Sequence, residues 1–291
     1  MLSLPVIESW LNAFNKKNKK SNIIFLGGEP TLHPELSQIV KKAKLMGYES
    51  ITIDTNGYLF HNILEKLDPD DVDYLSFSLD GQKRQTNDAI RGKGSYDRCI
   101  AGIQKAVKKK FNTSLIFTVS RENIHELSKI GPLVSDLGVD RLFIQVIGIR
   151  GRSAEEGGSL QLSKKEWLDA VPSAAADIAN LGITVTYPKV FLGPQETFEC
   201  AARVADNYFI FPNGRVYQCP LCEDYPIHGL QFIKNRLIPT ERINEGDLFR
   251  LDIPEGCVMN KLVQPDNLLY DENGVPEYKV ACCLLKEEIQ A

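Results

Sequence analysis

Two groups of residues in this 291-residue sequence are of types that could do chemistry. The first is Gly27-Gly28-Glu29, in which two glycines precede a carboxylate. Glycines let a backbone approach a ligand closely, and a carboxylate accepts hydrogen bonds from an ammonium group. The second group consists of six cysteines in the last third of the chain: Cys200, Cys219, Cys222, Cys257, Cys282 and Cys283. The sequence therefore predicts a ligand-binding turn and, far from it along the chain, a metal or cluster site.

The Gly-Gly-Glu run ends the first of several short segments rich in β-branched and aromatic residues, which we expect to be strands. These segments are 22–27, 50–55, 74–80, 114–120 and 142–148. Helical patterns are expected from Ser3 onward and at 35–46, 96–107, about 122–137 and about 163–181. Strands that alternate with helices predict an α/β fold with a parallel sheet. The chain begins with a helix, so segment 22–27 is expected to form an uncovered sheet edge.

The pattern changes after residues 182–188. Two hairpins are expected about Asn213-Gly214 and Asn273-Gly274, and each leads into cysteine. We therefore expect two domains, 1–192 and 193–291.

Polar residues and glycines gather where the predicted strands end, and ligands bind at that edge of parallel βα architectures. Thr55, Ser78 and Asp80 are examples. Asn-Gly and Asp-Gly are also common turn sequences, but their recurrence in successive turns favours a binding edge.

The segments "GGEPTLHPEL", "TIDTNGYL" and "SFSLDG", in this order and spacing, resemble the radical S-adenosylmethionine (SAM) superfamily over residues 4–150 or so. The resemblance implies a partial (βα)6 barrel of the TIM type, here without its first strand. It implies that Gly27, Gly28 and Glu29 bind the amino group of SAM. It further implies cofactor contacts from Thr55, Ser78, Asp80 and Ile147.

The sequence departs from this family at one point. The family holds a 4Fe-4S cluster through a C-x3-C-x2-C loop, and electron transfer from that cluster breaks SAM to give a 5′-deoxyadenosyl radical. Residues 1–98 contain no cysteine. We expect a chain truncated at its N-terminus and inactive as written; genuine loss of the cluster is the alternative.

The spacing of Cys200, Gly214 and Cys219 resembles the opening of SPASM and twitch extensions, which carry auxiliary 4Fe-4S clusters. The full SPASM cysteine series is missing, so the twitch type with one cluster is the better match. A structural zinc ion and buried free thiols are the alternatives. Cys99 is expected in the hydrophobic core.

The resemblance implies reductive cleavage of SAM and hydrogen abstraction from a substrate, with a peptide or protein as the substrate class and flavodoxin or ferredoxin as the reductant. The alternatives are a non-catalytic scaffold or binding protein with a degenerate barrel, and a zinc-binding interaction protein. A net charge of −4 argues against general nucleic-acid or membrane-surface binding. No apolar run is long enough to span a membrane, so a cytoplasmic location is expected. Arg150 and Arg152 either reach a substrate carboxylate or are solvated loop residues.

Overall fold

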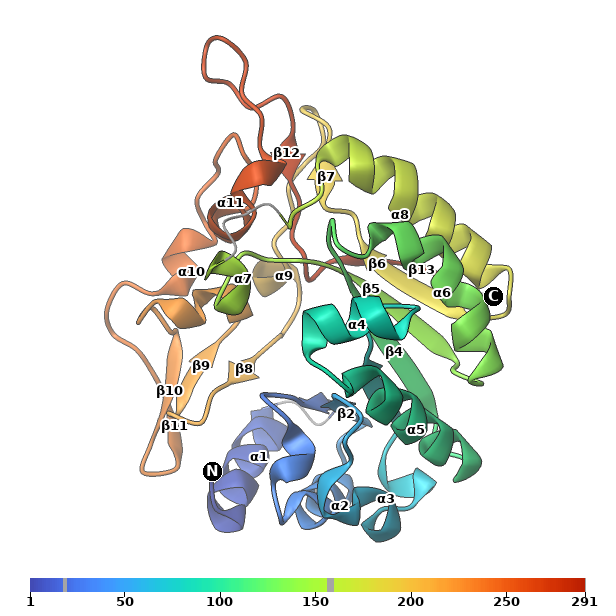
Figure 1. Cartoon of the computed structure of the whole chain (residues 1–291). Helices are drawn as coiled ribbons and strands as arrows, with labels where there is room; N and C mark the ends of the chain where they lie inside the picture. The colour runs from blue at the N-terminus through green and yellow to red at the C-terminus, as the bar shows by residue number, and fades with distance from the viewer. Residues whose placement is uncertain (18–19, 156–159, 291) are drawn as a thin grey trace.

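The computed structural model describes residues 1–17, 20–155 and 160–290 (Figure 1). Its main sheet has seven strands in the order β1-β2-β3-β4-β5-β6-β13 and curls into a half-barrel. The first six strands run parallel, and the seventh is antiparallel to β6. Their bounds are β1 (Asn22–Phe25), β2 (Ser50–Thr55), β3 (Tyr74–Ser78), β4 (Thr113–Val119), β5 (Arg141–Val146), β6 (Thr184–Pro188) and β13 (Lys286–Ile289).

The five predicted strands are confirmed within two residues of their expected ends. The predicted helices are also present, as α1 (Leu4–Lys17), α2 (Leu36–Leu45), α5 (Ser95–Lys108), α6 (Ile124–Asp136) and α8 (Lys164–Ala179). Shorter helices that the sequence did not indicate are α3 (Ile63–Lys66), α4 (Arg84–Arg91) and α7 (Arg152–Glu155). The parallel α/β prediction and the partial TIM-type barrel are therefore correct.

The two faces of the main sheet differ in character, because successive side chains of a strand point to opposite faces. One face packs under the helices and is fully buried, as Ile53, Phe77 and Phe117 show. The other face, which we call the open face, carries polar residues that lie opposite one another across the strands. They include Asp54, Ser76, Ser114, Thr118, Arg141, Gln145, Thr186 and Glu288. Figure 1 shows the long helices on one side of the sheet and strands β8–β11 on the opposite side.

The strand β1 lies at the edge of the sheet and pairs with β2 alone among the described strands. Ile24 is 54% exposed and Leu26 is 58% exposed. The expectation of an uncovered apolar edge is confirmed for the part of the chain that is described.

The region after β6 forms two small sheets. One is antiparallel in the order β11-β10-β9-β8, and the other pairs β12 with β7. The strands are β7 (Phe191–Leu192), β8 (Phe209–Ile210), β9 (Arg215–Tyr217), β10 (Leu230–Ile233), β11 (Arg236–Pro239) and β12 (Lys279–Val280). Short helices lie between them, at α9 (Ala201–Val204), α10 (Glu245–Leu248) and α11 (Val258–Val263).

The first predicted hairpin is confirmed by the pairing of β8 with β9. The second is also confirmed: Tyr270 bridges Pro276 in the antiparallel sense, and the N–H groups of Asp271 and Glu277 donate to the carbonyls of Val275 and Leu269. Beyond this hairpin its second arm continues into β12, which pairs with β7. Aromatic packing supports the pairing of β12 with β7: the rings of Phe191 and Tyr278 meet edge to face with centroids 5.4 Å apart.

Contacts between the first and last parts of the chain are extensive. The ring of Trp10 in α1 stacks on Phe232 in β10 at 4.5 Å, and Phe14 packs beside it. The strand β13 also returns from the last part of the chain to the main sheet. The domain boundary near residue 193 stays a prediction. None of the described helices is long and apolar enough to cross a membrane.

Candidate functional site

The turn after β1 leaves its backbone open to a ligand. Gly27 has φ +148°, a conformation that side-chain-bearing residues rarely adopt. Apart from each glycine and its two chain neighbours, no described residue has an atom within 4 Å of where a Cβ would stand at Gly27 or Gly28. Two successive peptide units at the carboxyl end of the strand are therefore unobstructed.

Four hydrogen bonds orient the carboxylate of Glu29. Its Oε1 accepts from the backbone N–H of Thr31 at 3.0 Å, from the Thr31 hydroxyl at 2.5 Å and from the Thr55 hydroxyl at 2.9 Å. Its Oε2 accepts from the N–H of Asn56 at 2.7 Å. These contacts join the end of β1 to the end of β2. An ionised carboxylate offers about four acceptor positions, two on each oxygen, so Oε2 retains capacity for one more donor.

The other predicted cofactor contacts lie along the same edge. Thr55 is buried and bridges Glu29 to the N–H of Gly57. Ser78 ends β3 and is half-buried. Ile147 follows the end of β5 and is also half-buried.

The carboxylate of Asp80 has partners within the protein. It lies 2.7 Å from the guanidinium of Arg91 and accepts from the N–H of Thr118 at 2.8 Å. Burial raises the pKa of Asp80, and the Arg91 charge acts in the opposite direction. Two buried amides complete the network: Asn87 accepts from the Asp80 N–H, and Asn123 donates to its carbonyl. Asp80 thus fixes the ends of β3 and β4, a role that its sequence position did not indicate.

Asp54 was not singled out by the sequence. It lies on the open face of β2 and opposite Ser76. Burial raises the pKa of Asp54 to about 6, against the opposing effect of a hydrogen bond with Ser76. The strict alternation of "SITIDT" places it on the face away from the core, but only the folded chain shows how far that face is enclosed.

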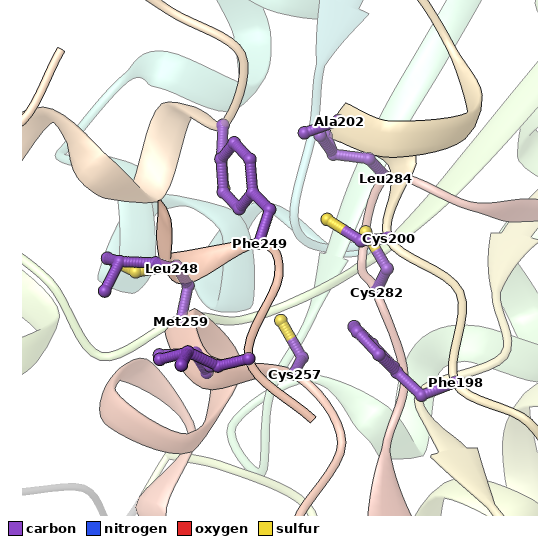
Figure 2. A pocket seen from close by; sticks show the side chains of 12 residues that line it. Phe198, Cys200, Ala202, Leu248, Phe249, Cys257, Met259, Cys282 and Leu284 are labelled. Atoms are coloured by element: carbon purple, nitrogen blue, oxygen red, sulfur yellow. The ribbon is translucent and has the colours of Figure 1, made fainter. Parts of the chain in front are cut away.

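Four of the six predicted cysteines line a single apolar cavity. They come from four separate segments: Cys200 before α9, Cys219 after β9, Cys257 before α11 and Cys282 after β12. Figure 2 shows Cys200, Cys257 and Cys282 around the same space, bounded by apolar side chains. Those side chains are Phe198, Leu248, Phe249, Met259 and Leu284. The fold therefore gathers thiols that are up to 82 residues apart, which the spacing alone could not establish.

The thiols interact in pairs. Cys200 hydrogen-bonds with Cys282, and this contact raises the pKa of Cys200 and lowers that of Cys282 to about 6. A hydrogen bond with Cys222 is the main cause that raises the pKa of Cys219. Burial raises the pKa of Cys257 to about 12. The two remaining predicted ligands, Cys222 and Cys283, do not line the cavity.

Glu245 supports the loop that carries Cys219. The carboxylate, 1% exposed, accepts from the N–H groups of Gln218 at 2.8 Å and Cys219 at 3.3 Å. Arg150 supports the next turn through ion pairs with Asp224 at 2.8 Å and Glu223 at 3.3 Å. Arg150 is thus a tether between the two parts of the chain, and the Arg152 side chain lies outside the described part.

Within the described residues, no three His, Cys, Asp or Glu side chains are arranged to hold a single metal ion. Cys99 is 1% exposed in the main core, as expected.

Residues 1–131 match the sequence profile of the Radical SAM superfamily. Residues 1–131 are a radical SAM domain. A probable GTP 3′,8-cyclase of Saccharolobus solfataricus is 34% identical over 125 residues, which cover 43% of this chain and 41% of the relative. A probable GTP 3′,8-cyclase of Metallosphaera sedula is 32% identical over 119 residues, covering 40% and 38%. The chain thus spans about two-fifths of the length of these curated relatives.

Solved structures extend the likeness of the fold beyond the radical SAM domain. Native anSMEcpe with bound AdoMet and the Kp18Cys peptide superposes with a TM-score of 0.64 at 13% identity, covering 96% of this chain and 85% of that one. Streptococcus suis SuiB bound to S-adenosylmethionine gives 0.55 at 13% identity, covering 76% and 54%. At such identities the comparison concerns the fold alone.

Proposed function

We propose that this chain binds SAM at the carboxyl ends of β1–β3, and that the whole protein is a radical SAM enzyme. In that activity, SAM is cleaved reductively to a 5′-deoxyadenosyl radical, which abstracts hydrogen from a substrate. The observation that carries the proposal is the Glu29 carboxylate, which four donors hold beside two unobstructed glycines. It lies at the edge where βα folds bind ligands.

In this proposal Glu29 accepts a hydrogen bond from the methionyl ammonium through Oε2, and the carbonyl groups of the glycine turn accept the rest. Thr55 acts by holding Glu29, and Asp80 acts by holding the strand that ends at Ser78. Ser78 and Ile147 are the proposed contacts for the ribose and adenine. Since Glu29 is fixed before SAM arrives, little side-chain entropy is lost on binding.

The cluster that cleaves SAM in this family does not fit the cysteines of this chain. Residues 1–98 contain none, and Cys99 is enclosed in the core. We therefore derive no step through that cluster, and we expect this chain alone to bind SAM without cleaving it.

An auxiliary 4Fe-4S cluster fits the cysteine cavity better. Cys200, Cys219, Cys257 and Cys282 would hold it, with Cys222 and Cys283 as the adjacent thiols. The apolar walls would exclude water from its sulfides. When bound, such a cluster supplies a second electron-transfer centre or a coordination point for a substrate. This assignment makes residues 193–291 a twitch-like module.

A peptide or protein is the proposed substrate class. The anSMEcpe structure contains a bound peptide and resembles this chain over nearly its full length. The GTP cyclase relatives align over less than half of this chain. A flavodoxin or ferredoxin would serve as the proposed reductant.

Isothermal titration with SAM tests the proposed site. The chain is expected to bind SAM, and Glu29→Gln is expected to weaken binding about 10- to 150-fold, since a hydrogen bond to a charged group contributes about 1.5–3 kcal/mol. Glu35→Gln is the control, because Glu35 lies at the start of α2 without a side-chain cap. No binding by the unmodified chain, or equal binding by Glu29→Gln, would contradict the proposal.

Anaerobic reconstitution with iron and sulfide tests the module. We expect one cluster, lost when the six cysteines from Cys200 onward are replaced. A cluster that survives those replacements would refute the assignment, and zinc in place of iron and sulfide would favour the interaction-protein alternative.

A further inference from the structure

Lys286 belongs to β13, the last strand in the order of the main sheet. It is the first residue of β13 and lies opposite Pro188, the last residue of β6. Because β13 is antiparallel, its first residue stands at the edge where the parallel strands end. Lys286 is therefore at the ligand-binding edge, on the side of the sheet opposite to β1 in strand order.

The strand register places Lys286 on the open face. Residues two apart in a strand share a face, so Lys286 shares one with Glu288. Glu288 contacts Thr186 at 3.5 Å and the guanidinium of Arg141 at 2.6 Å, both on the open face. The ammonium group of Lys286 thus belongs to the same concave surface as Ser78, Thr118 and Gln145.

No described residue forms an ion pair or hydrogen bond with this ammonium group. The other cations near this surface are paired: Arg141 with Glu288, Arg91 with Asp80, and Arg150 with Asp224. Lys286 is half-buried, and desolvation lowers its pKa, while the neighbouring Cys283 thiol acts in the opposite direction. A half-buried cation without a counter-charge is costly, and an anionic ligand would offset that cost.

The SAM carboxylate is too far away to be this ligand. It is attached to the same carbon as the ammonium that Glu29 is proposed to bind. From β1 to β13 there are six strand spacings, about 29 Å along the sheet, or about 18 Å straight across if the sheet is half a circle. The ligand of Lys286 is therefore a different molecule.

We infer that Lys286 binds a carboxylate of the substrate at the mouth of the half-barrel. A single lysine balances one negative charge. A nucleotide triphosphate carries several, and the described open face offers no second unpaired cation for it. The inference deepens the proposed function and rests on it, since it places the substrate across the open face from SAM.

Lysine acylation followed by mass spectrometry tests the inference in the whole chain saturated with SAM. The added probes are N-acetylglutamate, a short peptide containing one glutamate, the same peptide with glutamine, and GTP. We expect a carboxylate probe to slow labelling of Lys286 at least threefold and to leave Lys189 unaffected, since Lys189 is paired with Glu196. Protection by the free acid and peptide alike indicates a small carboxylate, and protection by the glutamate peptide alone indicates a peptide carboxylate; both support the inference.

The inference that Lys286 binds a carboxylate would be overturned by any of three results. These are stronger protection by GTP than by the carboxylate probes, equal protection by the glutamine and glutamate peptides, and no protection by any probe. Binding of the protecting probe is also measured by titration with Lys286→Met and Lys286→Arg. Lys286→Met should bind the protecting probe at least tenfold more weakly than the unmodified chain does, and Lys286→Arg should lose less affinity. Unchanged probe binding by Lys286→Met would likewise refute the role. Both variants should bind SAM like the unmodified chain, so failure of SAM binding is recognised separately as failure of the proposed function.

Discussion

The edge at the glycine turn, where we propose that SAM binds, and the cysteine cavity, where we propose that a cluster binds, are built in opposite ways. At the glycine-turn edge, donors from Thr31, Thr55 and Asn56 hold the Glu29 carboxylate in place. In the cavity, Cys200 hydrogen-bonds with Cys282, and the pKa values of Cys200, Cys219 and Cys257 are raised. The first site is complete before its ligand arrives, whereas the second must release protons before its thiolates can bind metal. The two regions should therefore respond differently to substitution.

The largest expected effect is the loss of iron from Cys257→Ala. Cys257 lines the cavity and caps α11 by accepting from the N–H of Asn260. Iron and sulfide analysis after reconstitution should show no stable cluster, while SAM affinity remains unchanged. Cys99→Ala is the control and should load iron normally. A variant that loses SAM binding together with iron would show that the two regions are not separable.

The second-largest expected effect is a dependence of the free energy of unfolding on pH. The pKa of Asp54 is raised by burial from 3.8 to about 6, so the folded state holds its proton more tightly than the unfolded state does. Stability is then highest below pH 4 and falls by up to about 3 kcal/mol between pH 4 and 6. Asp54→Asn should remove this fall.

Urea unfolding at pH 4 and pH 7 measures the Asp54 effect. The gain of Asp54→Asn over the unmodified chain should appear at pH 7 and vanish near pH 4. Asp136→Asn, at an exposed position of α6, is the control. A gain of equal size at both pH values would mean that the Asp54 carboxyl does not titrate in this window.

The smallest effect is expected for Thr31→Val. The buried Thr31 hydroxyl donates to Glu29 and accepts from the N–H of Phe60 at 3.2 Å. Loss of these contacts should cost about 1–2 kcal/mol of stability and weaken SAM binding a few-fold, because Thr55 and Asn56 still hold the carboxylate. Thr113→Val is a matched control: Thr113 is equally buried, and its hydroxyl has no partner within the described structure. If both variants weaken SAM binding equally, Glu29 is not held in the way described.

Much of this fold could be predicted from the sequence, and the exceptions have physical reasons. The central strands alternate buried apolar residues with residues of the open face and are rich in β-branched and aromatic residues, so their pattern is strong. By contrast, β13 reads "KEEI" and carries three charges, which resemble a solvated tail. The glycine turn was recognisable from its residues, but the holding of Glu29 by Thr55 and of the Cys219 loop by Glu245 depends on contacts between distant segments. Asp54 and Lys286 gain their properties from how far the open face is enclosed, and no local pattern records that.

The return of β13 to the main sheet has a consequence for how the two regions are coupled. The strands β6 and β13 are adjacent and antiparallel, and residues 189–285, which include all six cysteines from Cys200 onward, connect them. Closing a flexible turn of 97 residues costs about 3 kcal/mol more than closing one of four. Any cross-link among the cavity cysteines shortens that loop, so it lowers the cost of keeping β13 paired. Binding of a cluster in the cavity should therefore slow amide hydrogen exchange in residues 286–289. These residues lie at the edge of the sheet that is far from the glycine turn.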